Sequence, residues 1–494
     1  MPSRRDHFVK NQWLSSSGLV FSSRNPATEE MLWQGNAATD VEVNAAIEAA
    51  NAASSGWANL SVDERFAFLQ KFRELLVQSE EHLSETISKE VGKPLWESRG
   101  EVRSMAAKVN ISHQAYQERC PEVVNEHPYG KSIRRHKPHG VLAVFGPFNF
   151  PGHLPHSHII PALLAGNTIV FKPSELTPLV AEEIFSLWEK CSLPAGVINM
   201  VQGGRDTGHI LTGNIKGIDG LLFTGSWETG VVFSELLGKH PEKILALELG
   251  GNNPLVVTEV ANLDAAAYMT IQSAFLTSGQ RCSCARRLIV PKGSKGDAFI
   301  SRLVQMIESI KVGAYNESPE PFMGPVISEH SAHRILAVQE ALKHKGGISL
   351  VEVHLKKMDS ALLQPGLMDV TAVHHRPDEE IFGPFLQLIR VDSFDAAIEE
   401  ANKTAFGLTA GLLSDSHEEY AKFYKQMKAG VINWNTPLTG ASSAAPFGGI
   451  GRSGNHRPSG YYAADYCAYP VASVDAEQLV LPKELTPGIG FFDK

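Results

Sequence analysis

Residues 141–172 read VLAVFGPFNFPGHLPHSHIIPALLAGNTIVFK and contain two short apolar runs, 141–145 and 168–171, each with a Gly or Pro within two residues of both ends. Runs that are apolar throughout are typical of strands buried on both faces of a sheet. Between them the chain passes through a proline-rich loop into a segment long enough for a helix. The stretch therefore predicts a strand, a helix and a second strand, the repeating unit of a doubly wound parallel sheet.

The same alternation of short apolar runs and helix-length segments continues to about residue 434. In the first half we expect strands over 197–201, 220–224 and 244–247 and helices over 178–191 and 229–238. In the second half we expect strands over 253–257, 287–290, 385–391 and 430–434. Residues 41–118 instead show the spacing of amphipathic helices, with Phe68, Phe72 and Leu76 on one face. The pattern therefore predicts two α/β domains. Cofactors bind at the carboxyl ends of the strands in such sheets.

Composition is that of a soluble globular protein. The chain has 494 residues, 43% apolar and 20% charged, and a formal net charge of −9. A nucleic-acid-binding protein normally presents a basic face, so we expect no nucleic-acid partner. No stretch approaches the roughly 18 apolar residues of a membrane span, and no apolar segment follows the basic start, so we expect a cytoplasmic protein. Five irregularly spaced cysteines disfavour a disulfide framework and make a reactive thiol worth seeking.

Polar residues follow two of the expected strands. In Gly146-Pro-Phe-Asn149-Phe-Pro, a stiff loop holds an amide donor that suits an oxyanion, although a capping Asn in a turn explains the segment equally well. In Lys172-Pro-Ser174-Glu175, an ammonium and a carboxylate could hold the hydroxyls of an adenosine ribose. An acidic residue there repels a 2′-phosphate and favours NAD over NADP. The alternative for this pair is a solvated loop.

A third segment, Gly225-Ser226-Trp-Glu-Thr-Gly230, follows the strand at 220–224 and opens a helix. The N-terminus of that helix could face a pyrophosphate. Its spacing differs from the G-x-G-x-x-G fingerprint, so the segment alone is weak support for a nucleotide site.

Two more segments supply a carboxylate and a thiol. Glu248 follows the strand at 244–247, and Cys282 lies in Gly279-Gln-Arg-Cys282-Ser-Cys284. Oxidation of an aldehyde to an acid needs a soft nucleophile, a hydride acceptor and a base that activates water against the thioester. Cys282, NAD and Glu248 would supply these three. Taken singly, Glu248 could be a salt-bridged carboxylate and Cys282 a buried apolar residue.

Together, seven segments resemble the aldehyde dehydrogenase superfamily in identity and order over nearly the whole chain. They are Gly146-Pro-Phe-Asn-Phe-Pro, Lys172-Pro-Ser-Glu, Gly225-Ser-Trp-Glu-Thr-Gly, Glu248-Leu-Gly-Gly, Gly279-Gln-Arg-Cys, Glu380-Ile-Phe-Gly-Pro and Pro446-Phe-Gly-Gly. The resemblance implies an α/β fold with NAD as cofactor. It places a Rossmann-type NAD-binding domain at 1–115 and 139–249, an α/β catalytic domain at 250–447, and a small β oligomerisation element at 116–138 and 466–494. A homodimer or homotetramer is implied by the family.

The resemblance also implies a role for each matching residue. Cys282 would be the nucleophile, Glu248 the general base, and Asn149 with the Cys282 backbone N–H the oxyanion hole. The cofactor set would be Lys172 and Glu175 at the adenosine ribose, Ser226 at the pyrophosphate, Glu380 at the nicotinamide ribose, Phe382 near the nicotinamide, and Ser174, Gly225 and Gly230. One departure is Phe148, where many relatives have Trp; an aromatic ring remains.

A more distinctive set of segments is similar to the branch of the family that oxidises N-succinyl-L-glutamate 5-semialdehyde in bacterial arginine catabolism. These are Asn149-Phe-Pro-Gly-His-Leu-Pro-His-Ser-His, Glu248-Leu-Gly-Gly-Asn-Asn-Pro, Gln280-Arg-Cys-Ser-Cys-Ala-Arg-Arg and Gly454-Asn-His-Arg-Pro-Ser. Such a substrate carries two carboxylates besides its aldehyde, which need cationic or amide donors. Arg281, His456 and Arg457 are the candidates, and a salt bridge is the alternative for either arginine.

Two other interpretations stay open. The same machinery could oxidise another semialdehyde or an aliphatic aldehyde, and the cations of the pocket would decide between them. A non-catalytic family member would be expected to lack Cys282, Glu248 or Asn149, and all three are present. His153, His156 and His158 suggest a metal site, but no carboxylate lies close in sequence and the chemistry needs no metal, so none is expected.

Overall fold

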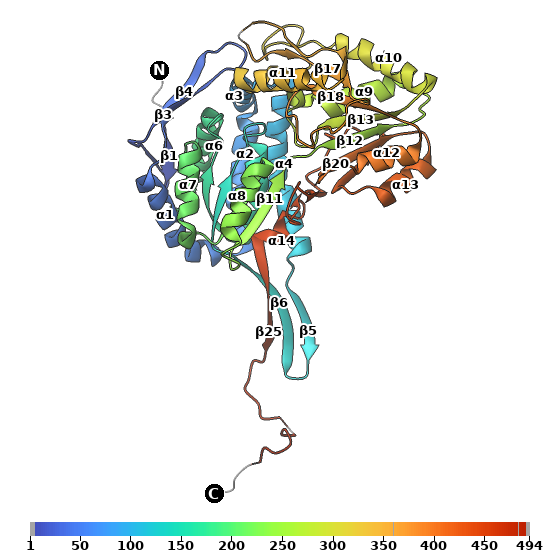
Figure 1. The fold of residues 1–494 in the computed structure, drawn as a ribbon. Helices are drawn as coiled ribbons and strands as arrows, with labels where there is room; N and C mark the ends of the chain where they lie inside the picture. Colours follow the sequence, from blue (N-terminus) through green and yellow to red (C-terminus); the bar gives the residue numbers. More distant parts are fainter. Residues whose placement is uncertain (1–4, 359, 483, 491–494) are drawn as a thin grey trace.

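The apolar runs of the first half of the chain form one seven-stranded sheet in the computed structural model, which describes residues 5–358, 360–482 and 484–490 (Figure 1). The strand order is β11-β10-β7-β8-β9-β1-β2. The first five strands are parallel, and β1 and β2 extend the sheet in antiparallel fashion. Their bounds are β1 His7–Val9, β2 Gln12–Leu14, β7 Val141–Phe145, β8 Thr168–Lys172, β9 Ile198–Met200, β10 Gly220–Gly225 and β11 Ile244–Leu249.

Helices cover both faces of this sheet (Figure 1). On one face lie α2 (Val62–Gln78), α3 (Glu80–Val91), α4 (Leu95–Arg119), α5 (His153–Ala165) and α6 (Pro178–Cys191). On the other lie α1 (Asp40–Ala58), α7 (Arg205–Gly213) and α8 (Trp227–Leu237). Strands covered on both sides must be apolar throughout, which is why the runs at 141–145 and 168–171 lack polar alternation. The expected α/β fold class is confirmed.

The second half of the chain forms another seven-stranded sheet, of order β14-β17-β18-β13-β12-β20-β21. All its strands run parallel except β14. The bounds are β12 Asn253–Val257, β13 Ala285–Pro291, β14 Ile348–Val351, β17 Gly366–Asp369, β18 Phe385–Val391, β20 Thr409–Leu413 and β21 Val431–Trp434. Its helices are α9 Leu263–Phe275, α10 Ser294–Glu308, α11 Glu329–His344, α12 Phe394–Ala401 and α13 His417–Gln426.

A three-stranded arm projects from the body (Figure 1). It consists of β5 (Val123–His127), β6 (Gly130–Pro138) and β25 (Ala468–Asp475), with β6 in the middle and both neighbours antiparallel to it. Within the predicted C-terminal part of the oligomerisation element, the strand ends at Asp475, and residues 476–482 and 484–490 contain no strand. The last four residues of the predicted oligomerisation element, 491–494, lie outside the described residues.

The remaining elements are short. They are β3 Val20–Arg24, β4 Met31–Asn36, η1 Ile215–Gly217, η2 Leu276–Gly279, β15 His354–Leu355, β16 Leu363–Gln364, β19 Phe406–Gly407, β22 Pro446–Phe447, β23 Ile450–Gly451, β24 Ser459–Gly460 and α14 Ala463–Cys467. Across the described ranges, no helix has both the length and the apolar character that crossing a membrane requires.

Candidate active site

Four of the predicted site residues lie at one edge of the first sheet. Asn149 follows β7, Lys172 ends β8, Ser226 follows β10, and Glu248 is the penultimate residue of β11. These strands are parallel neighbours in the order β11-β10-β7-β8, so their carboxyl ends meet at the same edge. This is the edge at which doubly wound sheets bind cofactors.

The residues predicted for the adenosine end of the cofactor are close together. Lys172 is buried, its Nζ lies 3.7 Å from Glu175 Oε2, and it donates to the Pro173 carbonyl at 2.9 Å. Burial lowers the pKa of Lys172, and the nearby Glu175 carboxylate opposes that shift. Ser174 Oγ accepts a hydrogen bond from the Leu176 N–H at 3.2 Å. Glu175 is exposed, so its carboxylate is open to a hydroxyl from solvent.

The segment Gly225–Gly230 forms a tight strand-to-helix turn. Ser226 caps α8, its Oγ accepting from the Thr229 N–H at 3.3 Å. A Cβ at Gly230 would lie 2.8 Å from the Leu249 side chain, and one at Gly225 would lie 2.3 Å from the Phe223 ring. The two glycines therefore allow the helix to start close to the sheet edge, where an N-terminus suits a pyrophosphate.

Cys282 lies in the loop between η2 and β13 and is partly exposed. Asn253, the first residue of β12, holds this loop: its Nδ2 donates to the Cys282 carbonyl at 2.6 Å and the Cys284 carbonyl at 2.9 Å, while its Oδ1 accepts from the Thr409 N–H at 3.1 Å. Burial raises the pKa of Cys282 to about 12, and the Glu380 and Glu248 carboxylates contribute. The thiol is therefore neutral at physiological pH in the absence of ligands.

The structure brings Asn149 and Glu248 to this loop from the first sheet. Asn149 Nδ2 donates to the carbonyl of Gln280, two residues before Cys282, at 2.7 Å. Glu248 is buried; its Oε1 accepts from the Ser459 N–H at 2.9 Å, and its Oε2 is without a hydrogen-bond partner among the described residues. Burial raises the pKa of Glu248 to about 8, against the effect of the bonds from Ser459. A carboxyl with that pKa can act as a base near neutral pH.

Glu380 and Phe382, predicted for the nicotinamide end, adjoin a buried arginine. Arg286 donates to the Gly279 carbonyl at 2.6 Å and the Arg281 carbonyl at 2.8 Å, and its third contact is Glu380 Oε1 at 3.3 Å. Its guanidinium lies 5.4 Å from the Phe382 ring. Burial raises the pKa of Glu380, and Arg286 opposes the shift. Arg286 thus links the Glu380 segment to the backbone of the Cys282 loop.

Two aromatic rings and one glycine complete that end. Phe148 meets Phe382 edge to face, with ring centroids 5.8 Å apart. A Cβ at Gly250 would lie 1.8 Å from Glu380 Oε2, so only glycine leaves room for this carboxylate beside β11.

The three substrate candidates occupy different surroundings. Arg281 forms an ion pair with buried Glu97, donates from Nε to Thr277 Oγ1 at 2.8 Å, and lies 4.9 Å from the Phe150 ring. His456 and Arg457 are exposed, on the segment after Gly454, which pairs with Glu248 of β11. Arg281 therefore already has a carboxylate partner within the protein.

Of the three histidines of α5, His156 and His158 are buried in the core and His153 is partly buried. His156 accepts from Trp188 Nε1 at 3.1 Å and lies 2.7 Å from the Gly152 carbonyl. His158 bonds to the Tyr466 hydroxyl at 2.8 Å and Thr224 Oγ1 at 3.0 Å. Burial lowers the pKa of His153 and His158 to about 3 and that of His156 to about 4. Within the described residues, no group of three or more His, Cys, Asp or Glu is arranged to hold a metal ion.

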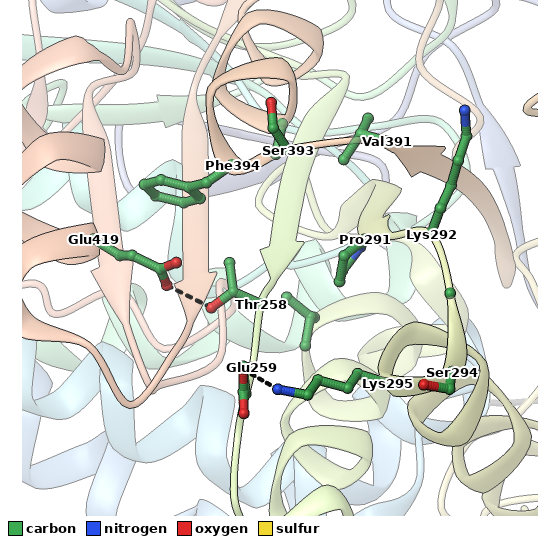
Figure 2. Close-up of a pocket in the computed structure, with 13 residues that line it drawn as sticks. Thr258, Glu259, Pro291, Lys292, Ser294, Lys295, Val391, Ser393, Phe394 and Glu419 are labelled. Carbon is green, nitrogen blue, oxygen red and sulfur yellow. Dashed lines mark hydrogen bonds and ion pairs between the residues drawn. The ribbon is translucent and has the colours of Figure 1, made fainter.

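A separate hollow of about 420 Å³ lies at the carboxyl ends of β12, β13 and β18 (Figure 2). Cys282 precedes β13, so this hollow opens at the opposite edge of the second sheet. Its lysines already have partners, Lys295 with Glu259 and Lys292 with Asp392, and Thr258 donates to Glu419 at 2.7 Å. The hollow is therefore separate from the candidate active site.

Some residues that shape the site were missed by sequence reasoning. Asn253 stands inside the quoted segment Glu248-Leu-Gly-Gly-Asn-Asn-Pro, and its amide was the available signal. Ser459 and Arg286 also lie in quoted segments, but nothing in their spacing indicates their contacts. Glu97 lies 185 positions before Cys282 in an amphipathic helix, where no local signal marks it.

Removing the Asn253 side chain is expected to loosen the Cys282 loop. In Asn253→Ala two carbonyls lose their donor, so we expect a fall in kcat of about tenfold and a loss of about 1–3 kcal/mol in stability. Asn252→Ala is the matched control, because Asn252 is also buried but donates to Asp378 at 2.9 Å. Steady-state kinetics and thermal unfolding of both variants check the prediction; equal kcat in the two would contradict it.

Comparisons with known proteins agree with this geometry. The sequence profile of the "Aldehyde dehydrogenase family" matches residues 13–470. The chain is 54% identical over 483 residues to "N-succinylglutamate 5-semialdehyde dehydrogenase" of Ectopseudomonas mendocina (strain ymp), covering 98% of this chain and 99% of that protein.

Solved structures agree as well. A crystal structure of aldehyde dehydrogenase from Brucella melitensis biovar abortus 2308 is 30% identical, with a TM-score of 0.89 over 95% of this chain and 97% of that one. Aldehyde dehydrogenase 21 from Physcomitrella patens, crystallised with the reaction product succinate, is 26% identical, with a TM-score of 0.89 over 97% of this chain and all of that one (100%). With Cys282, Glu248 and Asn149 gathered where two α/β sheets meet, and with a profile match that spans most of its length, this chain belongs to the aldehyde dehydrogenase family.

Proposed function

We propose that the protein is an NAD-dependent dehydrogenase that oxidises N-succinyl-L-glutamate 5-semialdehyde to N-succinyl-L-glutamate in arginine catabolism. The observation that carries the proposal is the 54% identity, over 98% of the chain, to a protein named for this substrate. The site supports the chemistry, because a thiol, an amide donor and a buried carboxylate converge on one loop.

Cys282 is the proposed nucleophile and Glu248 the proposed base. At a pKa of about 12 the Cys282 thiol must give up its proton to solvent as it attacks. Attack of sulfur on the aldehyde carbon places negative charge on the aldehyde oxygen. Asn149 Nδ2 donates one of its two hydrogens to the Gln280 carbonyl, so the second can be donated to that oxygen beside the Cys282 N–H.

Glu248 acts after oxidation, when the acyl group is held on sulfur as a thioester. Its free Oε2 takes a proton from a water molecule, whose oxygen attacks the thioester carbon and releases the acid and the Cys282 thiol. The Ser459 N–H keeps the carboxylate oriented through Oε1.

NAD is the proposed cofactor, and when bound it supplies the hydride acceptor. The residues fit a dinucleotide: Lys172 and Glu175 for the adenosine ribose, Ser174, Gly225, Ser226 and Gly230 for the phosphate side, and Glu380 with Phe382 for the nicotinamide end. The exposed Glu175 carboxylate favours a ribose 2′-hydroxyl and repels a 2′-phosphate, which supports NAD over NADP.

Substrate carboxylates are proposed to bind Arg281 or Arg457, with His456 nearby. Loss of a charge-assisted hydrogen bond would raise KM about tenfold or more, so we expect Arg281→Ala or Arg457→Ala to do so for the dicarboxylate semialdehyde but not for an uncharged aliphatic aldehyde. KM values for both aldehydes check the prediction. If both variants kept the parent KM for the semialdehyde, neither arginine would be a substrate ligand.

The domain boundaries predicted from the sequence and a homodimer or homotetramer are part of the proposal. The projecting arm supports an oligomerisation role, because β25 leaves the Val474 side chain exposed and residues 479–481 that follow it are apolar and exposed. Light scattering on the full chain tests the subunit number, and a monomeric mass would contradict this part.

The substrate proposal is tested by NADH formation with N-succinylglutamate 5-semialdehyde, succinic semialdehyde and simple aliphatic aldehydes, each with NAD and with NADP. We expect the highest kcat/KM for the first aldehyde with NAD. Preference for another aldehyde would keep the family chemistry and reject the substrate. Absence of activity on all of them would favour a non-catalytic family member.

A further inference from the structure

Helix α4 carries two fully buried carboxylates one helical turn apart, Glu97 and Glu101, with side chains 2% and 0% exposed. Glu97 reaches η2 and the Cys282 loop that follows it: it accepts from the Thr277 N–H of η2 at 3.2 Å and from the Thr277 hydroxyl, and it pairs with Arg281 of the loop. Burial acts to raise the pKa of Glu97, but Arg281 and Lys93 outweigh it and hold that pKa below its usual range. Glu97 is therefore an anion that binds the loop through backbone and side chain.

Glu101 reaches the other catalytic loop. Its Oε1 accepts from the Gly152 N–H at 2.9 Å and the His153 N–H at 3.1 Å, just after Asn149. Its Oε2 pairs with buried Lys93. An aromatic ring also contacts both ion pairs. The centroid of the Phe150 ring, next to Asn149, lies 3.4 Å from Lys93 Nζ and 4.9 Å from the Arg281 guanidinium. Helix α4 thus contacts the Cys282 loop through Glu97 and the Asn149 loop through Glu101.

The η2 segment that leads into the Cys282 loop needs contacts from outside to fix it, because its backbone is strained. Thr277 and Ser278 have φ of 54° and 55°, and Gly279 continues with 71°. The left-handed region costs an L-residue about 1–2 kcal/mol, and Thr is β-branched. Consecutive residues of this kind persist only where the surroundings fix them, and such strain is common at functional sites. Glu97 contacts the first of the three.

Stability alone is a poor reason for this arrangement. Three buried charges, Glu97, Glu101 and Lys93, lose their hydration, and Arg281 loses part of its own. Apolar residues of similar volume often hold a fold as well as a buried ion pair does. A carboxylate that accepts bonds from a loop in fixed directions gives orientation that apolar packing does not.

We propose that Glu97 and Glu101 are positioning residues that fix the Cys282 loop and the Asn149 loop relative to each other, so that thiol and amide meet the carbon and oxygen of the same aldehyde group. The proposal rests on the proposed roles of Cys282 and Asn149. It adds α4 to the catalytic apparatus as the element that sets their alignment.

Glu97→Gln and Glu101→Gln test the proposal, with Glu90→Gln as the matched control. Glu90 is buried like Glu101 and also accepts from two successive backbone N–H groups, those of Leu179 at 2.9 Å and Val180 at 2.8 Å in α6. It accepts from the Ser23 hydroxyl as well, and these three residues lie outside both catalytic loops. We expect kcat to fall about tenfold to a hundredfold in the first two variants, because small displacements of reacting groups cost that much. In Glu97→Gln and Glu101→Gln the Kd for NAD stays within about twofold of the parent value, since NAD binding does not depend on this alignment. In Glu90→Gln the kcat stays within about twofold of the parent value for the same reason.

Rescue distinguishes positioning from general destabilisation. Glycine adopts positive φ without strain, so Thr277→Gly in the Glu97→Gln background is expected to recover kcat about fivefold or more. If Glu97→Gln fails to fold, the double variant Glu97→Gln/Arg281→Gln, which removes both charges, is measured in its place. The same fall in kcat and the same recovery with Thr277→Gly are expected. Iodoacetamide alkylation of Cys282 without substrate should change in rate with Glu97→Gln and not with Glu90→Gln.

Equal kcat in the Glu97, Glu101 and Glu90 variants would overturn the proposal. A fall in kcat that only parallels the fall in thermal stability, and that Thr277→Gly does not reverse, would overturn it as well. Failure of the proposed function has a different signature, because the parent protein would then prefer another aldehyde or show no activity. If the proposed role of Cys282 were wrong, Cys282→Ala would retain turnover.

Discussion

Cys282→Ala is expected to abolish NADH formation from the semialdehyde, whereas Cys284→Ala retains it. Loss of a covalent nucleophile costs at least about a thousandfold in kcat, because the remaining groups have no thioester to form. The two thiols differ in surroundings: Cys282 is partly exposed beside Glu248 and Glu380, while Cys284 is fully buried with its Sγ 3.7 Å from the Leu276 carbonyl. Steady-state kinetics of both variants make the measurement.

The controls for this pair are structural. Both substitutions remove one sulfur from the same loop, so circular dichroism and thermal unfolding should show a folded protein in each case. NAD binding should remain in Cys282→Ala. Equal loss of activity in the two variants would undermine the assignment of Cys282, and full activity in Cys282→Ala would exclude it.

Glu248→Gln is expected to stall the enzyme after oxidation. Without a base to activate water, thioester hydrolysis should slow by about 10²–10⁴-fold. Rapid mixing with NAD and aldehyde should then give a burst of NADH of no more than one equivalent per site, followed by slow turnover. A variant with neither a burst nor turnover would show that Glu248 is needed before the thioester forms, and unchanged steady-state turnover would remove it from the mechanism.

The pH dependence of the parent enzyme follows from the same carboxyl. Its pKa is raised to about 8, so the base form increases as pH rises and deacylation should accelerate up to about pH 8 and then level off. Stability moves the other way. Relative to an ordinary Glu pKa of 4.5, the raised folded-state pKa gives a contribution that is complete below about 4.5 and is lost as pH rises through about 8. Glu248→Gln should lack this loss, so its thermal midpoint should exceed that of the parent above pH 8.

Much of the fold could be predicted because its central strands are covered on both faces. The runs at 141–145, 169–171 and 255–257 are apolar throughout and flanked by Gly, Pro or polar residues, which marks both their type and their ends. The strands β1, β2, β14, β17 and β20 were missed. The first four are short strands, and β20, Thr-Ala-Gly-Leu-Leu, contains small residues that weaken the pattern of a strand.

In the candidate site, too, some features could be predicted from the sequence and others could not. Asn149, Lys172, Ser226 and Glu248 follow or end predicted parallel strands, so topology alone brings them to one edge. Contacts that cross between distant segments left no trace in the pattern. The ion pair of Glu97 with Arg281 joins residues 184 positions apart, and the hold of Asn253 on the Cys282 carbonyl depends on the direction of one amide. Side-chain direction is set by tertiary packing, which periodicity does not report.

The most direct test of the account is mass spectrometry of Glu248→Gln quenched during the burst with NAD and N-succinylglutamate 5-semialdehyde. We expect the peptide that contains Cys282 to carry one N-succinylglutamyl group, released by hydroxylamine as a thioester should be, and Cys284 to be unmodified. A burst of NADH with no acyl group on Cys282, or with the group on another residue, would contradict the proposed chemistry.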